Sequence, residues 1–589
     1  MRYVCLPGAK NATRCRFDRN AKESLLKVRL IGVLALVIAM TGCKGEEQPA
    51  TATETAGSSG LEIVSDVEER RKQLPPTVID YDRTLLDDRE KQVLAKLVEA
   101  SKYMDQIFYR QVSEKNPEWH QALIADTSPQ AAHARAYFEN MKGPWDRLAE
   151  NEPFIAVGPK PEGAGFYPPD MTKQEFEAWI AANPADKESF QGLFTVIRRD
   201  GDRLVAIPYS THYKEFLDPA AKLLTEAAQM TGNASLRDYL TKLVAAFASN
   251  DYFQSDLAWM DLDSDIEVII GPYEVYEDEL FNYKASFESF ITVVDKPETA
   301  KLELYSKNLP AMERNLPIPD EHKNPNRGTD SPIRVVQEVF TAGDARRGVQ
   351  TAAFNLPNDE RVREAKGSKM VLLKNVMDAK FRQSGQPIAT RVLDSEQLPL
   401  VTFDAFFNHV LFHELSHGVG PGLITTPSGE RVETRILLKN LYSTIEEAKA
   451  DVLGLWNLMY AMDQKLMTSF DRRTLFATNT GVMFRSLRFG IDSAHGRGNA
   501  IQWNWFREKG AIVPVTDGRF RVDFTQMEEA TRSLATELLM IQATGDFARA
   551  EALVNKYGVS NPEMEEVIAR LEDIPVDIEP VFVGAGEKP

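Results

Sequence analysis

Apolar residues recur at every third or fourth position along much of this chain, which is the spacing of one helix face. The pattern predicts helices over residues 87–112, 403–417 and 443–462. Further helix starts are indicated by a Ser or Thr followed three residues later by Glu, an arrangement that caps the first helical turn. Such pairs are Thr172/Glu175, Ser443/Glu446 and Thr525/Glu528.

Shorter runs of β-branched and aromatic residues predict strands, most of them in the middle of the chain. Residues 194–197 and 204–207 flank Asp200-Gly201, a pair that favours a hairpin turn. Four other runs have the length and composition of strands, namely 267–270, 290–294, 369–373 and 520–524. We therefore expect an α+β, mainly helical protein.

Residues 413–417 read His-Glu-Leu-Ser-His, an HExxH pentad inside the predicted helix 403–417. His413 and His417 are four positions apart, so they lie on one face about 6 Å apart along the axis. Two imidazoles so placed can bind one zinc ion, and Glu414 lies beside it, where a carboxylate can take a proton from water. His413 and His417 are therefore candidate zinc ligands, and Glu414 is the candidate general base. A buried helix with two incidental histidines is the alternative.

A third ligand must come from elsewhere in the chain. The extended motif HExxHxxGxxH is excluded because position 423 is Leu423. His409 lies on the same stripe but about 12 Å from His417 along a straight helix, too far to share an ion, so we expect it in the core or behind a ligand. Glu447, in the next predicted helix, is the candidate third ligand. A charged residue that merely suits the helix dipole is the alternative.

The start of the chain predicts export. Residues 30–40 form the longest apolar run, which is too short to span a membrane. Basic residues precede this run and Thr41-Gly42-Cys43 follows it, as in a bacterial lipoprotein signal. We expect a signal peptide at 1–42, lipid on Cys43, a flexible tether at 43–60, and a place in the cell envelope. Lys44 is consistent with the outer membrane, facing the periplasm, and secretion or a periplasmic location without lipid is the alternative.

Charge and cysteine content narrow the function further. The formal net charge is −18, and removing residues 1–42, which hold eight basic and two acidic residues, would make it −24. Such an acidic body argues against nucleic acid as a partner, because phosphates would be repelled. Cys5 and Cys15 would leave with the signal peptide and Cys43 would carry lipid, which excludes cysteine catalysis. The membrane is expected as a partner through the lipid anchor only.

Several segments together resemble the dipeptidyl peptidase III family of zinc metallopeptidases, and the match covers most of residues 60–580. The pentad is joined by four segments whose order and rough spacing agree with the family. Most members of the family have a zinc motif of six residues, HExxGH. This chain has five, HExxH, and so resembles the pentapeptide variants of the family. The four segments are residues 270–278 with 287–290 (IG-x-x-E-x-Y-x-D … FE-x-F), 355–359 (N-x-P-N-D), 446–451 (EE-x-[RK]-A-[ED]) and Ala494-His495.

The resemblance implies release of dipeptides from the N-terminus of short peptides, with one zinc ion. It also implies two lobes and a wide cleft: a β-containing substrate lobe with a β-barrel core at 61–399, and a helical zinc lobe at 400–589. The residues it assigns are Tyr276 and His495 for catalysis, Glu274, Glu288, Asn355 and Asn358 for substrate, and Glu446 and Asp451 for orienting the zinc ligands. A zinc aminopeptidase or endopeptidase, or a peptide-binding lipoprotein with structural zinc, stays open. The oligomeric state is also open.

Overall fold

The computed structural model describes residues 61–323, 332–426 and 429–588. The signal peptide, the tether and Cys43 lie outside these residues, so the lipoprotein anchor stays a prediction. Within the described ranges, no helix has both the length and the apolar character that a membrane crossing requires.

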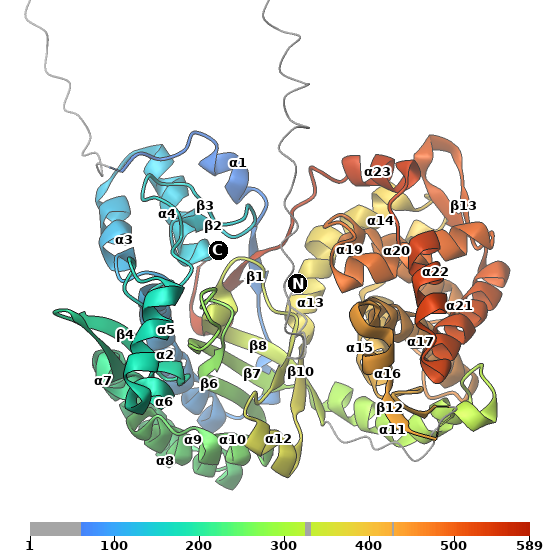
Figure 1. Ribbon diagram of the computed structural model, residues 1–589. Coiled ribbons are helices and arrows are strands. Elements are labelled where there is room, and N and C mark those ends of the chain that lie inside the picture. Colours follow the sequence, from blue (N-terminus) through green and yellow to red (C-terminus); the bar gives the residue numbers. More distant parts are fainter. Residues whose placement is uncertain (1–60, 324–331, 427–428, 589) are drawn as a thin grey trace, which may run out of the picture.

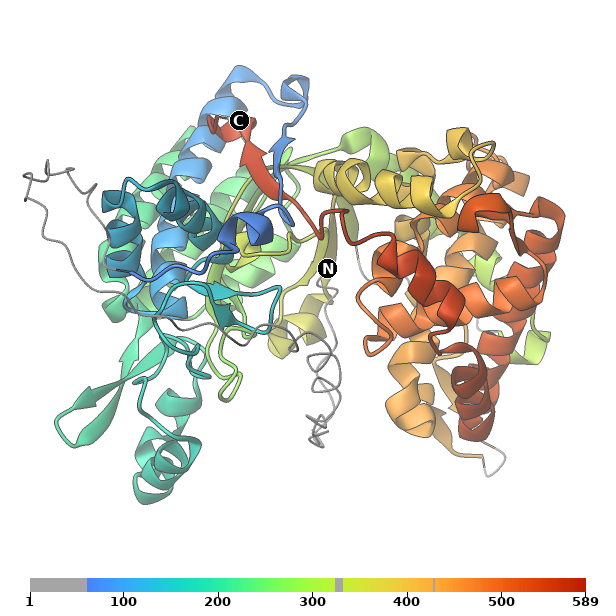
Figure 2. The ribbon, with the colours of Figure 1, turned by 90° about the horizontal axis from the view of Figure 1, so that it is seen from above.

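Helices dominate the chain, and they gather around two large hydrophobic cores. Figures 1 and 2 show the two groups of elements side by side: the sheet group around the first core, coloured mostly blue to green, and the helical group around the second core, coloured mostly yellow to red. The first core surrounds a sheet and includes Leu97, Tyr239 and Phe287. The second core is built almost wholly from helices and includes Phe412 and Trp503. The mainly helical α+β class predicted from the sequence is therefore confirmed.

A five-stranded sheet forms the centre of the first group. Its strands run antiparallel except for one parallel pair, β8 with β10. Three of the five confirm predicted strands, whereas β8 and β9 were not anticipated. In spatial order they are β6 (Ile266–Glu274), β7 (Ser286–Val294), β8 (Ile333–Gly343), β10 (Lys369–Leu373) and β9 (Ala353–Leu356).

The sheet is strongly curved, yet it is not a closed barrel. Phe290 on β7 stacks on Phe354 on β9 with ring centres 4.3 Å apart, although two strands lie between them. Lys369 on β10 likewise reaches Glu267 on β6, at 3.3 Å. Among the described strands, however, no backbone ladder joins the edge strands β6 and β9. The expected β-barrel core is therefore wrong, because the sheet curls without closing.

Helices cover this sheet, and a hairpin projects beside it. α2 (Asp88–Val112) begins after Asp87, whose side chain accepts the Glu90 N–H, and packs on β7 and β8. α8 (Lys214–Met230) and α9 (Ala234–Ser249) pack in turn behind α2. The predicted hairpin is confirmed as β4 (Thr195–Asp200) and β5 (Arg203–Pro208), which pair apart from the main sheet (Figure 1). The predicted Thr172 cap is confirmed at the start of α5 (Lys173–Ala182).

Four helices of the second group carry or support the candidate metal ligands. One of them, α17, lies at the centre and packs against the other three. The four are α15 (Phe403–His417), α17 (Tyr442–Asp463), α20 (Ala494–Glu508) and α21 (Phe524–Thr544).

Two helix starts differ from the sequence prediction. α17 continues directly from a 3₁₀ turn at Lys439–Leu441, so Ser443 lies inside the helix and caps nothing. α21 is capped by Asp523, two residues before the predicted Thr525. Asp523 follows the strand β14 (Phe520–Val522), which confirms the run predicted at 520–524.

The chain passes between the two cores more than once. α11 (Lys296–Arg314) lies between β7 and β8 in the sequence but packs into the helical core. At the other end, β15 (Glu579–Phe582) leaves the helical group and pairs in parallel with β1 (Pro76–Ile79). The C-terminal segment therefore ties the helical group back to the sheet group (Figure 2).

Candidate metal centre

Three imidazoles and one carboxylate converge where α15, α17 and α20 meet. The Nε2 atom of His413 lies 3.2 Å from Nε2 of His417 and 3.4 Å from Oε2 of Glu447. The same Glu447 oxygen lies 3.9 Å from Nε2 of His417 and 3.1 Å from Nδ1 of His495. Neighbouring ligand atoms around a tetrahedral zinc are about 3.3 Å apart, because each bond is about 2 Å long. His413 and Glu447 can thus share an ion with either His417 or His495.

The tautomers of the two motif histidines explain why a cation belongs between them. Nδ1 of His413 lies 2.7 Å from Asp451 Oδ1, and Nδ1 of His417 lies 2.8 Å from Glu446 Oε1. A neutral imidazole that donates its Nδ1 proton to a carboxylate has a lone pair on Nε2. With both imidazoles neutral in this tautomer, the two Nε2 lone pairs would face each other across 3.2 Å, an arrangement that a positive ion between them would stabilise.

Glu447 contributes a third atom that can donate a lone pair to a metal ion, the carboxylate oxygen Oε2. Its Oε2 is buried and has no hydrogen bond of acceptable geometry among the described residues. Burial raises the pKa of this carboxyl, but His413 and His495 outweigh burial and hold the pKa well below its usual value. Conversely, burial lowers the pKa of His413, whereas Asp451 and Glu447 raise it well above its usual value. The site therefore attracts positive charge, and its nitrogen and oxygen donors fit a metal ion such as zinc.

Glu446 holds His417 from the side away from the metal position. Its Oε1 faces His417 Nδ1 and also the ammonium group of Lys449 at 2.8 Å, while its Oε2 accepts from Gln542 Nε2 at 2.7 Å. Burial raises the pKa of Glu446, but Lys449 and His417 lower it to about 2. A carboxylate with every oxygen engaged in this way fixes both the orientation and the tautomer of the imidazole.

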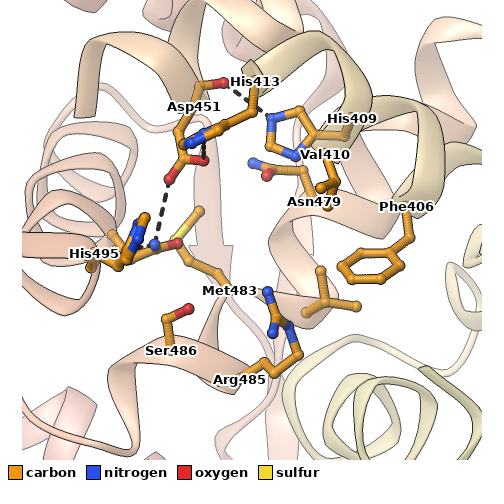
Figure 3. A pocket seen from close by; sticks show the side chains of 12 residues that line it. Phe406, His409, Val410, His413, Asp451, Asn479, Met483, Arg485, Ser486 and His495 are labelled. Carbon is orange, nitrogen blue, oxygen red and sulfur yellow. Dashed lines mark hydrogen bonds and ion pairs between the residues drawn. The ribbon is translucent and has the colours of Figure 1, made fainter. Parts of the chain in front are cut away.

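Asp451 holds His413 in the same manner. Its Oδ2 accepts from Gln502 Nε2 at 2.9 Å and from Asn499 Nδ2 at 3.3 Å, and its backbone carbonyl lies 2.9 Å from His409 Nε2. Figure 3 shows Asp451 joined by dashed lines to both His409 and His413. Burial raises the pKa of Asp451, but His413 lowers it to about 2. His409 thus supports Asp451 and does not lie among the candidate ligands.

Lys449 is a supporting residue that the sequence analysis passed over. Its buried ammonium donates to the carbonyls of Ser416 and Val419, at 2.9 and 3.0 Å, as well as contacting Glu446. It thereby ties the last turn of the HExxH helix to α17. The sequence does mark this residue, because Lys449 occupies the [RK] position of the 446–451 motif. Gln542 lies 96 residues from Glu446, and no spacing pattern marks it.

Two glycines let the helices approach closely enough for this geometry. A Cβ atom on Gly454 of α17 would lie 3.2 Å from the His409 ring and 3.3 Å from the backbone nitrogen of His413. A Cβ atom on Gly498 of α20 would lie 3.2 Å from the backbone nitrogen of Ala448. Because either side chain would push helices apart, glycine at both places keeps α15 and α20 close to α17.

Glu414 and a small cavity lie next to these groups. Glu414 is half-buried, and in the described ranges it makes no hydrogen bond or ion pair, so its carboxylate is available to take a proton. A cavity of about 50 Å³ borders the other side of His413, lined in part by Arg485 and His495 (Figure 3). Because a single water needs only about 10–15 Å³, the cavity has room for ordered water beside the candidate ligands.

The residues predicted to bind substrate lie on or directly after strands of the five-stranded sheet, and not in the helical group that holds the metal donors. Asn358, in the loop after β9, donates to the Tyr273 carbonyl at 3.2 Å and to Glu274 Oε1 at 3.4 Å. Asn355 on β9 has a buried Oδ1 atom that meets no hydrogen-bond donor in the described part of the chain. Glu288 is buried on β7, opposite Gly271 of β6. Since β6 and β9 are opposite edges of the sheet, its curvature is what brings Glu274 and Asn358 together.

The two residues assigned to catalysis beside Glu414 are placed differently. His495 begins α20 and lies in the cluster itself, 3.1 Å from Glu447. Tyr276 follows β6 on the sheet side, and its side chain is 40% exposed. The predicted site is thus divided between the helical group, which holds the metal donors, and the sheet group, which holds Tyr276 and the substrate residues.

Comparison with known proteins shows the family of this chain. Residues 170–435 match the profile of peptidase family M49, a stretch that includes the HExxH pentad. The solved structure of dipeptidyl peptidase III from Caldithrix abyssi is 51% identical, with a TM-score of 0.83 over 87% of this chain and 98% of that one. The enzyme from Corallococcus sp. strain EGB is 44% identical, with a TM-score of 0.70 over 88% and 97%.

Two curated proteins are also similar to this chain in sequence. Nudix hydrolase 3 of Arabidopsis thaliana is 38% identical over 570 residues, which cover 88% of this chain and 74% of that protein. Human dipeptidyl peptidase 3 is 22% identical over 416 residues, which cover 61% of this chain and 56% of the human protein. The full-length structural matches, together with the family profile, decide the assignment. The chain belongs to the dipeptidyl peptidase III family, peptidase family M49, and is a metallopeptidase of the dipeptidyl-peptidase type.

Proposed function

We propose that this protein is a zinc-dependent exopeptidase that releases dipeptides from the N-terminus of short peptides. The observation that carries the proposal is the convergence of the His413 and His417 Nε2 atoms and the buried Glu447 oxygen, next to the half-buried Glu414 carboxylate. The family membership supports peptides as the substrate class.

His413, His417 and Glu447 are the proposed zinc ligands. The trio with His495 in place of His417 is also compact. However, Nδ1 of His417 is held by Glu446, a carboxylate outside the set of converging donors, as is common for ligand histidines, whereas Nδ1 of His495 faces Glu447 itself. A zinc ion bound by these groups supplies a Lewis acid that polarises a carbonyl and acidifies water. The protein supplies the orientation of each donor through Glu446 and Asp451.

Proton transfer is assigned to Glu414. Its carboxylate takes a proton from the attacking water and returns it to the nitrogen of the departing peptide, as a positioned carboxylate can. His495 and Tyr276 are proposed to donate hydrogen bonds to the oxygen that gains negative charge during the attack. This requires the sheet group and the helical group to act as two lobes that enclose the peptide in a cleft between them.

The sheet side is proposed to set the length of the product. Glu274 carries a negative charge, and Asn355 and Asn358 carry amide oxygens, so together they can bind the free ammonium group of a peptide. The buried Asn355 Oδ1 atom is an acceptor that a substrate donor would satisfy. Glu288 is proposed to border the same subsite. Holding the N-terminus there would place the second peptide bond at the metal centre.

Product analysis tests the proposal. A defined hexapeptide incubated with zinc-loaded enzyme should give dipeptides as the first products when the reaction is followed by chromatography and mass spectrometry. Single amino acids as first products would identify an aminopeptidase instead. Internal fragments alone would identify an endopeptidase, and intact hexapeptide bound at the site would indicate a binding lipoprotein with structural zinc.

We also propose that the mature enzyme is anchored by lipid at Cys43 in the outer membrane and faces the periplasm. The support is the order of basic residues, apolar run and Thr41-Gly42-Cys43 in the sequence. Cys43→Ser should move the protein from the membrane fraction to the soluble envelope fraction. A Cys43→Ser protein that stays membrane-bound after a salt wash would contradict the anchor.

A further inference from the structure

The turn that presents Tyr276 has an unusual distribution of burial. Glu277 and Asp278, the two residues that follow Tyr276, are both completely buried carboxylates, each at 0% exposure. Tyr276 itself is 40% exposed. The half-exposed phenol is thus carried by a turn whose next two side chains are completely buried, so the position of the turn affects where the phenol lies.

Asp278 shapes the turn from within. Its two carboxylate oxygens accept hydrogen bonds from four backbone N–H groups that lie two to six residues later, at 2.8 to 3.1 Å. The hydroxyl of Tyr167 donates to the same carboxylate at 2.8 Å. These bonds fold residues 278–284 around one side chain. The four donors are the backbone nitrogens of Leu280, Phe281, Tyr283 and Lys284.

Glu277 connects the turn to three other parts of the sheet group. Arg147, which follows β2 (Trp145–Asp146), donates to both Glu277 oxygens, at 2.9 and 3.2 Å. Lys160 lies 3.2 Å from Oε1, and Arg347, which follows β8 and its 3₁₀ turn, lies 2.9 Å from Oε2. The Lys160 and Arg347 side chains are only 2% and 5% exposed. One carboxylate thus fixes the turn against three separate segments.

The charges in this cluster balance. Lys160 also pairs with Glu279 at 3.0 Å, and Arg347 also pairs with Asp344, so three cations face three carboxylates. Burial alone would raise the pKa of Glu277, but the three cations outweigh burial and keep the carboxylate ionised. Buried ion clusters of this kind add little net stability compared with apolar packing, whereas they can define one geometry. A loop that carries a reacting group needs such support, because loops position side chains less well than helices or strands.

We propose that Glu277 is a positioning residue for Tyr276, and that its ion cluster with Arg147, Lys160 and Arg347 holds the turn so that the phenol meets the substrate bound at the metal centre. The inference deepens the proposed function and rests on the role assigned there to Tyr276. Asp278 keeps the turn folded, and Glu277 sets where the folded turn lies.

The main variant removes the charge and keeps the shape. Glu277→Gln in the zinc-loaded, full-length enzyme should lower kcat by roughly tenfold to a hundredfold, the cost of misplacing a reacting group by about 1 Å. KM should change by less than about threefold, because Glu277 does not touch the substrate. Glu279→Gln is the matched control: it lies on the same turn and contacts the same Lys160, but its side chain is 46% exposed. We expect its kcat to stay within about twofold of wild type.

A double-mutant cycle distinguishes positioning from a general loss of structure. Tyr276→Phe should lower kcat, and adding Glu277→Gln to it should lower kcat no further, since the group being positioned is already gone. If the two effects multiply, Glu277 does not act through Tyr276, and the inference fails while the role of Tyr276 stands. If Tyr276→Phe alone keeps full kcat, the role of Tyr276 fails and this inference fails with it, whereas dipeptide release is judged separately from the products.

Folding is checked in the same samples by thermal unfolding and zinc content. Should Glu277→Gln fail to fold, Arg147→Gln replaces it in the cycle, because Arg147 is the most exposed of the three cations, at 11%. Arg147→Gln should reduce kcat less than Glu277→Gln would, but with the same lack of additivity toward Tyr276→Phe. Multiplying effects in that cycle would overturn the inference as well.

Discussion

The helical group and the sheet group solve the same problem, the placement of polar side chains, in different ways. In the helical group, His413 and His417 are each held by a carboxylate within 2.8 Å, and each carboxylate is held by an amide side chain from a further helix. In the sheet group, Asn358 contacts Glu274 at 3.4 Å and the Tyr273 carbonyl at 3.2 Å, both longer distances, and Tyr276 is 40% exposed. The metal donors are therefore arranged before any substrate arrives, whereas the peptide itself would complete the substrate side.

The acids of the two groups also differ in protonation. In the helical group, the pKa values of Glu446 and Asp451 are lowered to about 2 by neighbouring cationic groups, despite burial. In the sheet group, Asp256 on α10 (Phe253–Met260) has its pKa raised to about 8, by burial first and by Asp359 second. The two buried carboxylates that orient candidate metal ligands are thus charged, whereas Asp256 keeps its proton up to about pH 8.

The largest effect is expected at the metal donors. Glu447→Ala should remove zinc and lower turnover by roughly a thousandfold or more, because the metal contributes several kcal/mol to transition-state stabilisation. Metal analysis after dialysis measures the occupancy. Asp463→Asn, at the exposed end of the same helix, is the control and should keep its zinc. Full zinc occupancy in Glu447→Ala would remove Glu447 from the ligand set.

Glu414 should separate metal binding from proton transfer. Glu414→Gln should keep zinc, since Glu414 is not one of the converging donors, and should lower kcat by about a hundredfold or more. Zinc content and steady-state rates are measured on the same preparation. A zinc-replete variant with a near-normal rate would show that another group takes the proton.

The smallest effect concerns the neutral acid of the sheet group. A carboxyl whose pKa is higher in the folded state holds its proton there longer, so stability falls as the pH rises from about 4 to about 8. Asp256→Asn, which mimics the protonated form, should therefore raise the thermal midpoint by a few degrees at pH 8 and hardly at all at pH 5. An equal change at both pH values would mean that Asp256 is not neutral in the folded enzyme.

Much of the helical centre can be predicted from the sequence, because its spacing rules are local. A separation of four positions places His413 beside His417, and Glu447 one turn before Asp451, whatever the rest of the chain does. The contacts of Lys449 with the Ser416 and Val419 carbonyls could not be read in this way, because they depend on how two helices cross.

Local residue spacing predicts less of the site in the sheet group. Glu274 and Asn358 are 84 residues apart, and only the curvature of the sheet joins them, so their pairing came from the family resemblance and not from any pattern. The strands β8 and β9 were missed. The barrel was expected from the family resemblance; the sheet is indeed curled, but backbone pairing stops short of closing it.

The central claim is that the sheet side holds a free N-terminus while the helical side holds the metal. Its most direct test compares one peptide with and without an acetylated N-terminus, in the wild-type enzyme and in Glu274→Gln, by kcat/KM. A charge-assisted hydrogen bond contributes about 1.5–3 kcal/mol, so acetylation should lower kcat/KM of the wild type by roughly tenfold to a hundredfold. Glu274→Gln should lose most of that preference and should weaken the free peptide far more than the acetylated one. Equal cleavage of both peptides by the wild-type enzyme would contradict the account.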